Sequence, residues 1–360
     1  MTFRRFGKPH KHLRDPFVTQ VTAQRWQCTE CGYVFRVYPQ GVTRRQQSLR
    51  LQALSVFFWM LGMSLGAVTD ALEPFGCDLS RQAVLLNLRR AGVAARKEKR
   101  EYLRSKAKVR VVGMDCTHVK LQGKDKSVIQ TVDAQTGIIL DITPLPGEDE
   151  RTIKRYVQMI AKLTGCAVIL TDDADVFKAG ADAAAVQQQV CQGHVVPNTL
   201  QLLSEIVEQL ESLPAESHGP ANLSISDALD DLATLEEIIL GRAAGSAKDL
   251  DRLRRRYQDA PLPRKGTKAS PWWRLRLMTL DLSEDWPRLT LVDRYRDDTG
   301  KRLVPPTNNI SEQQIGLNIK ERYRTMRGYK SMKSLRCLPL LTAHLRENQS
   351  SACLASLLAA

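Results

Sequence analysis

Three acidic residues stand in contexts that suit metal-dependent chemistry on a phosphodiester. Asp115 and Asp172 each end an apolar run typical of a buried strand, and Glu312 opens a basic helical segment that reaches Tyr329. Two carboxylates at strand ends and a third on a later helix can hold a pair of divalent metal ions. Carboxylate and water ligands suit magnesium or manganese, the metals of polynucleotide cutting and strand transfer. These three residues are therefore predicted to be catalytic and to bind Mg²⁺ or Mn²⁺.

Each of these carboxylates also has a plainer interpretation. Asp115 would fit a turn at the end of a strand, and Glu312 would fit a carboxylate near the positive end of a helix. Asp173 competes with Asp172, which is favoured because it directly follows the strand. Asp172 lies 57 positions after Asp115, and Glu312 lies 140 positions after Asp172. The order and contexts of all three together favour catalysis over the separate plain readings.

Cys191 and His194 form a C-x2-H pair just after a strand. They are candidates for metal ligands or for a proton-handling pair. A thiolate does not belong among magnesium ligands, so the favoured interpretation is that the pair supports the active site or a DNA strand.

Two basic helical segments are predicted to contact DNA, with a solvated helical face as the alternative for each. The first is a helix over 81–90 that follows a tight turn, an arrangement typical of a major-groove reader. Its candidate DNA-binding residues are Arg81, Gln82, Asn87, Arg89 and Arg90. The second follows Glu312, where basic side chains would hold phosphates beside the metal ions. Its candidates are Lys320, Arg322, Arg324 and Arg327.

The positive charge of the chain is concentrated near its N-terminus. Residues 1–110 hold 21 Lys and Arg against 7 Asp and Glu, which accounts for the whole net charge of +14. A basic N-terminal third on a neutral body is typical of a nucleic-acid-binding module attached to another domain. A basic tail is the alternative, but the apolar periodicity of residues 46–92 argues against it.

The composition is that of a soluble protein with room for two or three domains, since 43% of its 360 residues are hydrophobic. Eight cysteines without a framework pattern indicate reduced thiols and a cytoplasmic setting. The apolar stretch 51–68 contains polar and small residues and indicates a buried helix pair, so no membrane contact is expected. The basic N-terminus has no apolar segment behind it, so no secretory signal is evident.

Cys28 and Cys31 have the spacing that places two thiolates on one tetrahedral zinc ion. A complete site needs two further ligands, and no second pair of this kind lies nearby. His10 and His12 could supply them, although histidines in a basic leader are more often solvated. A Zn²⁺ cofactor in this partial ribbon therefore stays an open alternative.

Five segments are distinguished by periodicity and charge. They are a partial zinc-ribbon-like segment (1–42), a helix-turn-helix domain (43–93), a basic helical linker (94–108), a catalytic core (109–195 and 305–345) and a mainly helical insertion (196–304). A domain boundary is expected near residue 108, where the pattern changes from helix to strand.

The expected core combines strands and helices in a characteristic order. Strands are predicted over 109–114, 127–132, 138–144, 166–171 and 186–190, and helices over 148–163 and 173–185. Three antiparallel strands followed by alternating helix and strand are the ribonuclease H-like arrangement, with Asp115 on the central strand. The fold class is thus α/β, a mixed sheet with a helical insertion, preceded by the ribbon-like segment and an all-α helix-turn-helix domain.

Some local features have structural interpretations. Ser64 and Ser80 are predicted N-caps of short helices, and residues 307–309 are expected to cap the helix of Glu312. In the insertion, Trp272 and Trp273 are interpreted as packing residues in preference to base-stacking ones, since Trp is largely buried on average.

The chain resembles the DDE transposases of bacterial insertion sequences, in particular the Mutator-like group with a helical insertion before the glutamate. The resemblance is carried by Gly113-Met114-Asp115, Leu170-Thr171-Asp172-Asp173, Cys191-x2-His194, Asn308-Asn309-Ile310-Ser311-Glu312, Lys320-x-Arg322-x-Arg324 and Arg327-Gly328-Tyr329. It covers most of the chain and is weakest over 196–300. Members with a full zinc ribbon have an earlier cysteine pair, which this sequence lacks.

The resemblance implies a transposase that binds the terminal inverted repeats of its element and catalyses metal-dependent strand cleavage and transfer. Double-stranded DNA would be the partner, and synapsis of two ends implies a homo-oligomer. Two rival functions remain: an inactive, transposase-derived DNA-binding regulator, which has no need of three carboxylates, and a ribonuclease H-like nuclease that cuts branched DNA without strand transfer.

Overall fold

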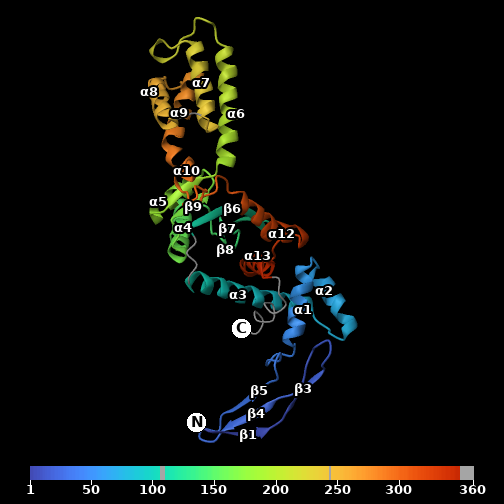
Figure 1. Cartoon of the computed structure of the whole chain (residues 1–360). Helices are drawn as coiled ribbons and strands as arrows, with labels where there is room; N and C mark the ends of the chain where they lie inside the picture. Colours follow the sequence, from blue (N-terminus) through green and yellow to red (C-terminus); the bar gives the residue numbers. More distant parts are fainter. Residues whose placement is uncertain (106–109, 243–244, 349–360) are drawn as a thin grey trace.

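The computed structural model describes residues 1–105, 110–242 and 245–348. The molecule is elongated, with a helical bundle at one end, a sheet near the middle and the N-terminal strands at the other end (Figure 1). The predicted boundary near residue 108 and the predicted start of the first core strand at Val109 lie outside the described residues.

A five-stranded mixed sheet forms the centre of the molecule. Its strands are β6 (Val111–Leu121), β7 (Lys124–Asp133), β8 (Ile139–Pro144), β9 (Val168–Thr171) and β10 (Gln187–Val190). The order across the sheet is β10-β9-β6-β7-β8, in which β6 to β8 are antiparallel and β9 and β10 run parallel to β6. This mixed α/β arrangement is consistent with the ribonuclease H-like core expected from the sequence, and β6 is its central strand.

The first strand is longer than predicted. β6 continues to Leu121, so Asp115 lies within the strand and not at its end. Beyond Asp115 the strand pairs residue by residue with β7 until Gln122 and Gly123 turn the chain with positive φ angles of 52° and 78°. The sequence prediction stopped too early because this half of the strand carries alternating polar residues, as expected where one face is solvated.

Helices cover both faces of the sheet. Val112 and Met114 point to one face and pack in a hydrophobic cluster with residues of α4 (Glu150–Thr164) and α5 (Asp175–Ala184). Val119 and Leu121 point to the other face, in a cluster with residues of α11 (Asn309–Ile315) and α13 (Met332–Glu347). Because side chains alternate along a strand, Asp115 belongs to the same face as Val119, the face that α11 covers.

Three helices precede the sheet, namely α1 (Leu49–Met60), α2 (Leu65–Leu72) and α3 (Arg81–Ser105), with a 3-10 turn η1 (Glu73–Phe75) after α2. Ser64 and Ser80 accept hydrogen bonds from backbone amides three residues ahead, as N-caps do. Ser64 and Ser80 thus begin helices as predicted, but α3 continues to Ser105, well beyond the predicted end at residue 90.

The predicted linker is not a separate element, because residues 94–105 form the second half of the single helix α3. Ala91 and Ala95 join a hydrophobic cluster that also contains Leu338 and Leu341 of α13. Arg96 of α3 donates a 3.1 Å hydrogen bond to Asp141 of β8. Apolar and charged contacts thus hold residues 94–105 against α13 and the sheet. The charged composition of this segment could not indicate these contacts.

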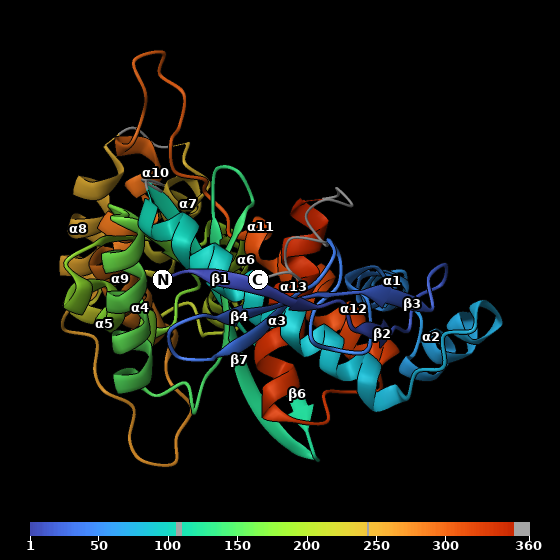
Figure 2. The ribbon, with the colours of Figure 1, turned by 90° about the horizontal axis from the view of Figure 1, so that it is seen from below.

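Small sheets form the N-terminal end. The strands β1 (Phe3–Gly7), β4 (Gln24–Cys28) and β5 (Val34–Val37) form one antiparallel sheet, and β2 (His10–His12) pairs with β3 (Gln20–Thr22). Figure 2, seen from below, shows these strands in blue passing beneath the rest of the chain.

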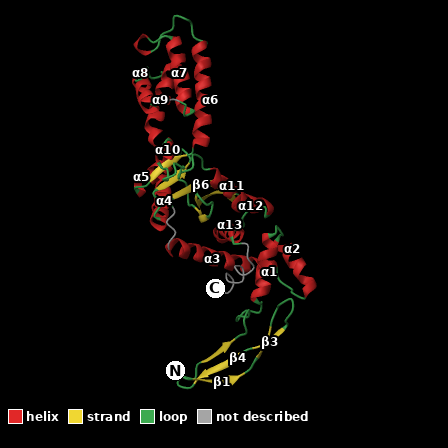
Figure 3. Cartoon of the chain, viewed as in Figure 1, coloured by secondary structure: helices red, strands yellow, loops and turns green. Residues whose placement is uncertain are grey.

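The insertion is mainly helical, as predicted. It comprises α6 (Gln192–Glu211), η2 (Pro220–Asn222), α7 (Ile225–Ile239), α8 (Ser246–Tyr257), α9 (Pro271–Leu289) and α10 (Leu291–Arg294). The helices α6, α7, α8 and α9 pack around their own hydrophobic cluster at one end of the molecule (Figure 3). Trp272 is buried in that cluster, 7% exposed, which confirms its interpretation as a packing residue.

After the insertion the chain returns to the sheet through α11. A π-helical turn η3 (Gly316–Lys320) and a short helix α12 (Glu321–Thr325) continue from α11 before α13 begins. None of the helices in the described part of the chain is long and apolar enough to span a membrane.

Candidate active site

Asp115 and Asp172 lie side by side at the junction of β6 and β9. The parallel pairing joins Gly113 of β6 to Leu170 of β9. Two positions further along both chains, the same register brings Asp115 next to Asp172, which directly follows β9. The ladder itself ends at Gly113 and Leu170, and the two aspartates are close enough for the charge of Asp172 to raise the pKa of Asp115. Asp173, the competing candidate, instead forms a 2.9 Å ion pair with Lys178.

The electrostatics of this pair show that its charge is poorly compensated. Burial, the charge of Asp172 and the charge of Glu312 raise the pKa of Asp115 to about 6. Burial is also the largest cause of the raised pKa of Asp172. Within the described residues, no Lys or Arg forms an ion pair with either aspartate. Buried carboxylates that repel one another without a cationic partner are typical of a site built for a cation.

Two polar contacts and one glycine hold α11 against β6. Asn308 donates through its side-chain amide to the carbonyl of Met114 at 2.8 Å, and its Oδ1 accepts from Ser311 Oγ at 2.7 Å. Asn308 was expected to cap the helix, but its side chain makes no capping bond. The amide is used instead to join α11 to the strand that carries Asp115.

Gly113 makes this close approach sterically feasible. A Cβ at Gly113 would lie 2.6 Å from Ser311 Oγ and 2.9 Å from Asn308 Oδ1. On β7, Gln130 pairs with Asp115 in the ladder and donates to the carbonyl of Ser311 at 3.1 Å. The motif that ends in Asp115 thus also docks the helix that carries Glu312. The sequence motif contains Gly113 but does not reveal its role, and Gln130 carries no local sequence signal.

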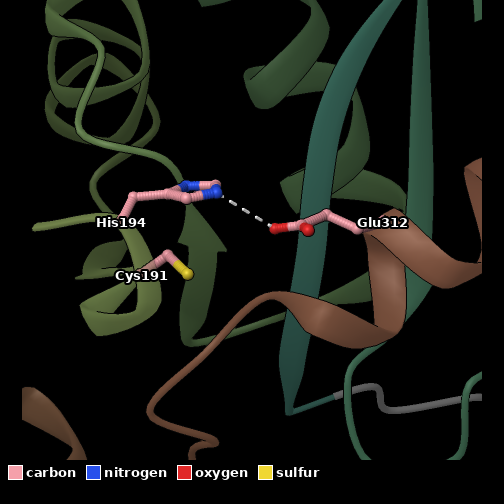
Figure 4. Close-up of side chains that lie close together, drawn as sticks. All are labelled: Cys191, His194 and Glu312. Carbon is pink, nitrogen blue, oxygen red and sulfur yellow. Dashed lines mark ion pairs between the residues drawn. The ribbon is translucent and has the colours of Figure 1, made fainter. Parts of the chain in front are cut away.

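Glu312 lies in the first turn of α11 and faces the start of α6. Its Oε1 is 3.4 Å from His194 Nε2, and both side chains are about half exposed. Cys191, the residue before α6, is fully buried, and its Sγ accepts a 3.2 Å hydrogen bond from the backbone amide of Asn308. Figure 4 shows the His194 ring and the Glu312 carboxylate pointing toward each other, with the Cys191 thiol beside them. Cys191 and His194 therefore lie next to Glu312, although they are far from it in the sequence.

The donor set of Asp115, Asp172 and Glu312 fits hard divalent cations. All three offer carboxylate oxygens, which magnesium and manganese prefer, and the site lacks a compensating Lys or Arg among the described ion pairs. A protonated His194 would lower the pKa of both aspartates, and the backbone hydrogen bonds from Cys116 to Asp115 and from Ala174 to Asp172 act in the same direction. The chemistry of these residues therefore fits the metal ions that the sequence suggested, but their carboxylate oxygens do not all lie within 4.8 Å of one another; among the described residues that spacing is met by Cys191, His194 and Glu312.

Glu148 is an acidic residue at this end of the sheet that sequence reasoning did not assign. Its charge contributes to the raised pKa of Asp172. Its Oε1 accepts from Ser127 Oγ at 2.5 Å and lies 3.3 Å from His118 Nε2. Glu148 lies in the loop between β8, which ends at Pro144, and the N-cap of α4, Asp149.

The candidate DNA-binding residues of α3 separate into exposed and inward ones. Arg81 and Gln82 are exposed in the first turn of the helix. Asn87 is fully buried and donates to Gln47 and Ser55, so its assignment as a DNA-reading residue is wrong for this conformation. The helix turns this position toward the core, which a basic sequence pattern does not reveal.

The last two candidates on α3 are half-buried. Arg89 donates to Ser331 Oγ at 2.8 Å and so ties α3 to the start of α13. Arg90 lines a cavity of about 290 Å³ together with Arg14 and Arg45. Burial and the neighbouring Arg45 charge lower the pKa of Arg90. Arg89 is thus engaged within the fold, whereas Arg90 belongs to a concentrated positive site.

The basic residues that follow Glu312 likewise divide into exposed side chains and a buried one. Lys320, Arg324 and Arg327 are exposed. Arg322 is only 4% exposed and lies over the ring of Trp59 of α1, with its guanidinium carbon 4.0 Å from the ring centroid. Its assignment as a phosphate-binding residue is therefore replaced by a packing role between α12 and α1.

The proposed zinc ligands do not assemble into a complete site. Cys28 is buried at the end of β4 and Cys31 is exposed in the turn that follows, and hydrogen bonds within this turn lower the pKa of Cys28. His10 and His12 do not join them. Across the described residues, Cys191, His194 and Glu312 form the one group of three or more His, Cys, Asp and Glu side chains with metal-ligand spacing. Zinc at the N-terminal pair is thus unsupported.

Comparisons with known proteins give limited similarity. No protein-family model and no curated protein matches the chain. The HTLV-2 integrase catalytic core domain in complex with magnesium, in its trimeric form, aligns over 33% of this chain and 95% of that chain at 15% identity and a TM-score of 0.21. Its dimeric form covers 34% and 97% at 15% identity and a TM-score of 0.20. The function proposed below therefore rests on the geometry of this chain itself.

Proposed function

We propose that this chain is a DNA transposase of the DDE type, which binds the ends of its element and cleaves and transfers DNA strands with magnesium or manganese. The observation that carries the proposal is the neighbouring pair Asp115 and Asp172: the charges of Asp172 and Glu312 both raise the pKa of Asp115, and no Lys or Arg of the described residues forms an ion pair with either aspartate. Such a cluster is costly to fold and becomes favourable when divalent cations bind.

The three acids are the proposed metal ligands. Asp115, Asp172 and Glu312 would hold the ions through their carboxylate oxygens. When bound, the two ions supply Lewis acidity toward the attacking and leaving oxygens of a phosphodiester. Asn308 and Gln130 hold α11 so that Glu312 stays opposite the aspartates, and His194 orients its carboxylate.

The exposed cations supply a path for DNA. Lys320, Arg324 and Arg327 extend beyond Glu312 along the same chain segment and would bind the phosphates next to the reacting one. Arg81 and Gln82 at the start of α3, with Arg90 near Arg14, would bind the element end. Reaction at two ends implies that more than one copy of the chain joins the DNA complex.

The test is cleavage of duplex DNA that carries the element ends, in magnesium, by wild type and by Asp115→Asn. We expect the substitution to lower the cleavage rate by at least about 1000-fold, because metal ions contribute several kcal/mol of transition-state stabilisation. Asp173→Asn is the matched control, since Asp173 adjoins Asp172 but pairs with Lys178. It should stay within about threefold of wild type.

The rival functions predict different results in the same assay. A regulator would bind the ends without cleavage in either magnesium or manganese. A branched-DNA nuclease would cut junctions in preference to element ends and would give no strand-transfer product. Cleavage that survives Asp115→Asn would contradict the assigned acids.

A further inference from the structure

Cys191, His194 and Glu312 form a group whose chemistry differs from that of the three carboxylates. One ligand atom from each residue, namely a thiol sulfur, an imidazole nitrogen and a carboxylate oxygen, lies within 4.8 Å of the other two. His194 Nε2 and Glu312 Oε1 are 3.4 Å apart. Two ligands at about 2.0–2.1 Å from one tetrahedral zinc ion are about 3.3 Å apart, so this separation suits a shared metal.

The fold presents the three ligands from two fixed elements. Cys191 and His194 are three positions apart at the start of α6, which places them on neighbouring positions of one helical turn. Glu312 comes from α11, which Asn308 joins to β6. The amide of Asn308 also donates to Cys191 Sγ, so one residue connects both elements. The group is therefore positioned by the fold and not by flexible loops.

The exposure of these side chains fits a metal site with one open coordination position. Cys191 is fully buried, whereas the side chains of His194 and Glu312 are 53% and 43% exposed. An ion could enter from the solvent side and keep a water as its fourth ligand, the usual arrangement of three protein ligands around an open zinc site. Thiolate and imidazole ligands select zinc-like metals over magnesium.

We propose that Cys191, His194 and Glu312 bind a transition-metal ion of the zinc class, and that this ion competes with magnesium for Glu312. The binding part stands on the geometry alone. The competition part rests on the proposed function, because it requires Glu312 to serve the carboxylate centre. Zinc in this site would withdraw one catalytic ligand and inhibit strand cleavage.

Cobalt binding tests the site directly, since Co²⁺ replaces Zn²⁺ and reports a thiolate ligand through a near-ultraviolet charge-transfer band. The full chain with Cys28→Ser and Cys31→Ser serves as the background, so that the N-terminal thiols cannot contribute. We expect the band in this background, its loss on addition of Zn²⁺, and its persistence in magnesium. Absence of the band would overturn the proposal.

Three substitutions in that background locate the ligands. Cys191→Ser should remove the charge-transfer band, and His194→Asn should weaken cobalt affinity at least about tenfold, since even outer-shell changes cost about 10–100-fold. His118→Asn is the matched control, because His118 also faces a carboxylate, Glu148, at 3.3 Å. A band that survives Cys191→Ser, or equal losses in His118→Asn and His194→Asn, would refute the assigned ligands. His194 is exposed, so its variant tests binding even if the buried Cys191 variant unfolds.

Competition is tested by zinc inhibition of magnesium-dependent cleavage, with each protein normalised to its own uninhibited rate. The zinc concentration for half inhibition should rise at least about tenfold in His194→Asn. Equal inhibition of both proteins would overturn the competition and leave the cobalt site intact. If wild type shows no cleavage at all, the proposed function fails, while the cobalt spectrum still decides whether the metal site exists.

Discussion

At the β8 edge of the sheet, Asp141 accepts hydrogen bonds from Arg96 at 3.1 Å and from Tyr156 at 3.0 Å. At the centre of the same sheet, Asp115 is similarly withdrawn from water but faces Asp172 and Glu312, and no cationic side chain pairs with it within the described residues. Side chains of the fold therefore compensate the negative charge of Asp141 but not that of Asp115. The contrast teaches that an uncompensated acid must be stabilised by something bound, whereas a compensated acid stabilises the fold.

The largest expected effect on stability comes from removing Arg96, the cationic partner of Asp141. Arg96→Met should remove the partner of Asp141 and also the bonds of Arg96 to Thr143, Ile142 and Arg336. Breaking such a part-buried pair costs about 3–5 kcal/mol. Denaturant unfolding at neutral pH measures this loss. A change below about 1 kcal/mol would mean that the α3 contacts do not stabilise the fold, and the comparison would break.

A second prediction concerns Gly113, where α11 approaches the strand that carries Asp115. In Gly113→Ala, the new Cβ would meet Ser311 and Asn308 and push α11 away from β6. A displacement of about 1 Å near the reacting groups costs roughly 100-fold in rate. The cleavage assay should show this loss with little change in end binding, measured by mobility shift. Gly123→Ala, where a Cβ has open space but φ is +78°, is a control that strains the backbone far from α11.

The third prediction uses the pKa of Asp115, which is about 6 in the folded chain against 3.8 for the ordinary carboxyl. Between these values the unfolded state has lost its proton and the folded state has kept it, so stability falls as pH rises from about 4 to about 6. Asp115→Asn removes this penalty. We expect the variant to be more stable than wild type at pH 7 by about 3 kcal/mol, and equal to it below pH 4.

Thermal unfolding across pH measures this difference, and magnesium supplies a second readout. Magnesium should stabilise wild type at pH 7 and have a smaller effect on Asp115→Asn, because ligands that bind the folded state raise its stability. Destabilisation by Asp115→Asn at neutral pH would show that Asp115 is compensated after all. Asp141→Asn is the matched control and should destabilise the chain.

The smallest expected effect concerns two neighbouring arginines, one exposed and the other held within the fold. Arg324 is exposed and forms no ion pair in the part of the chain that the structure describes, whereas Arg322 is buried over Trp59. Arg324→Gln should weaken DNA binding a few-fold and lower the salt slope by about 1, since one phosphate contact is lost. Arg322→Gln should lower the unfolding temperature instead. Titrations at several salt concentrations separate the two, and equal salt slopes would contradict the division.

Much of the fold was predictable because its signals are local. Apolar runs marked the strands that carry Asp115 and Asp172, Ser64 and Ser80 marked helix starts, and a leucine-rich pattern marked the helical insertion. The extent of β6 was not predictable, since its outer half is held by pairing with β7 and not by its own residues. Likewise, residues 94–105 look like a charged linker until α13 packs against them.

The sequence by itself determined the chemical kinds present: acids that directly follow apolar runs, a thiol and an imidazole three positions apart, and cations along two helices. Only the tertiary structure decided which of them meet. The strand register placed Asp115 beside Asp172, and Asn308 with Gly113 brought Glu312 to the same face. Packing turned Asn87 and Arg322 inward. The physical reason is that residue type is a local property, whereas compensation of a charge depends on partners supplied by distant segments of the chain.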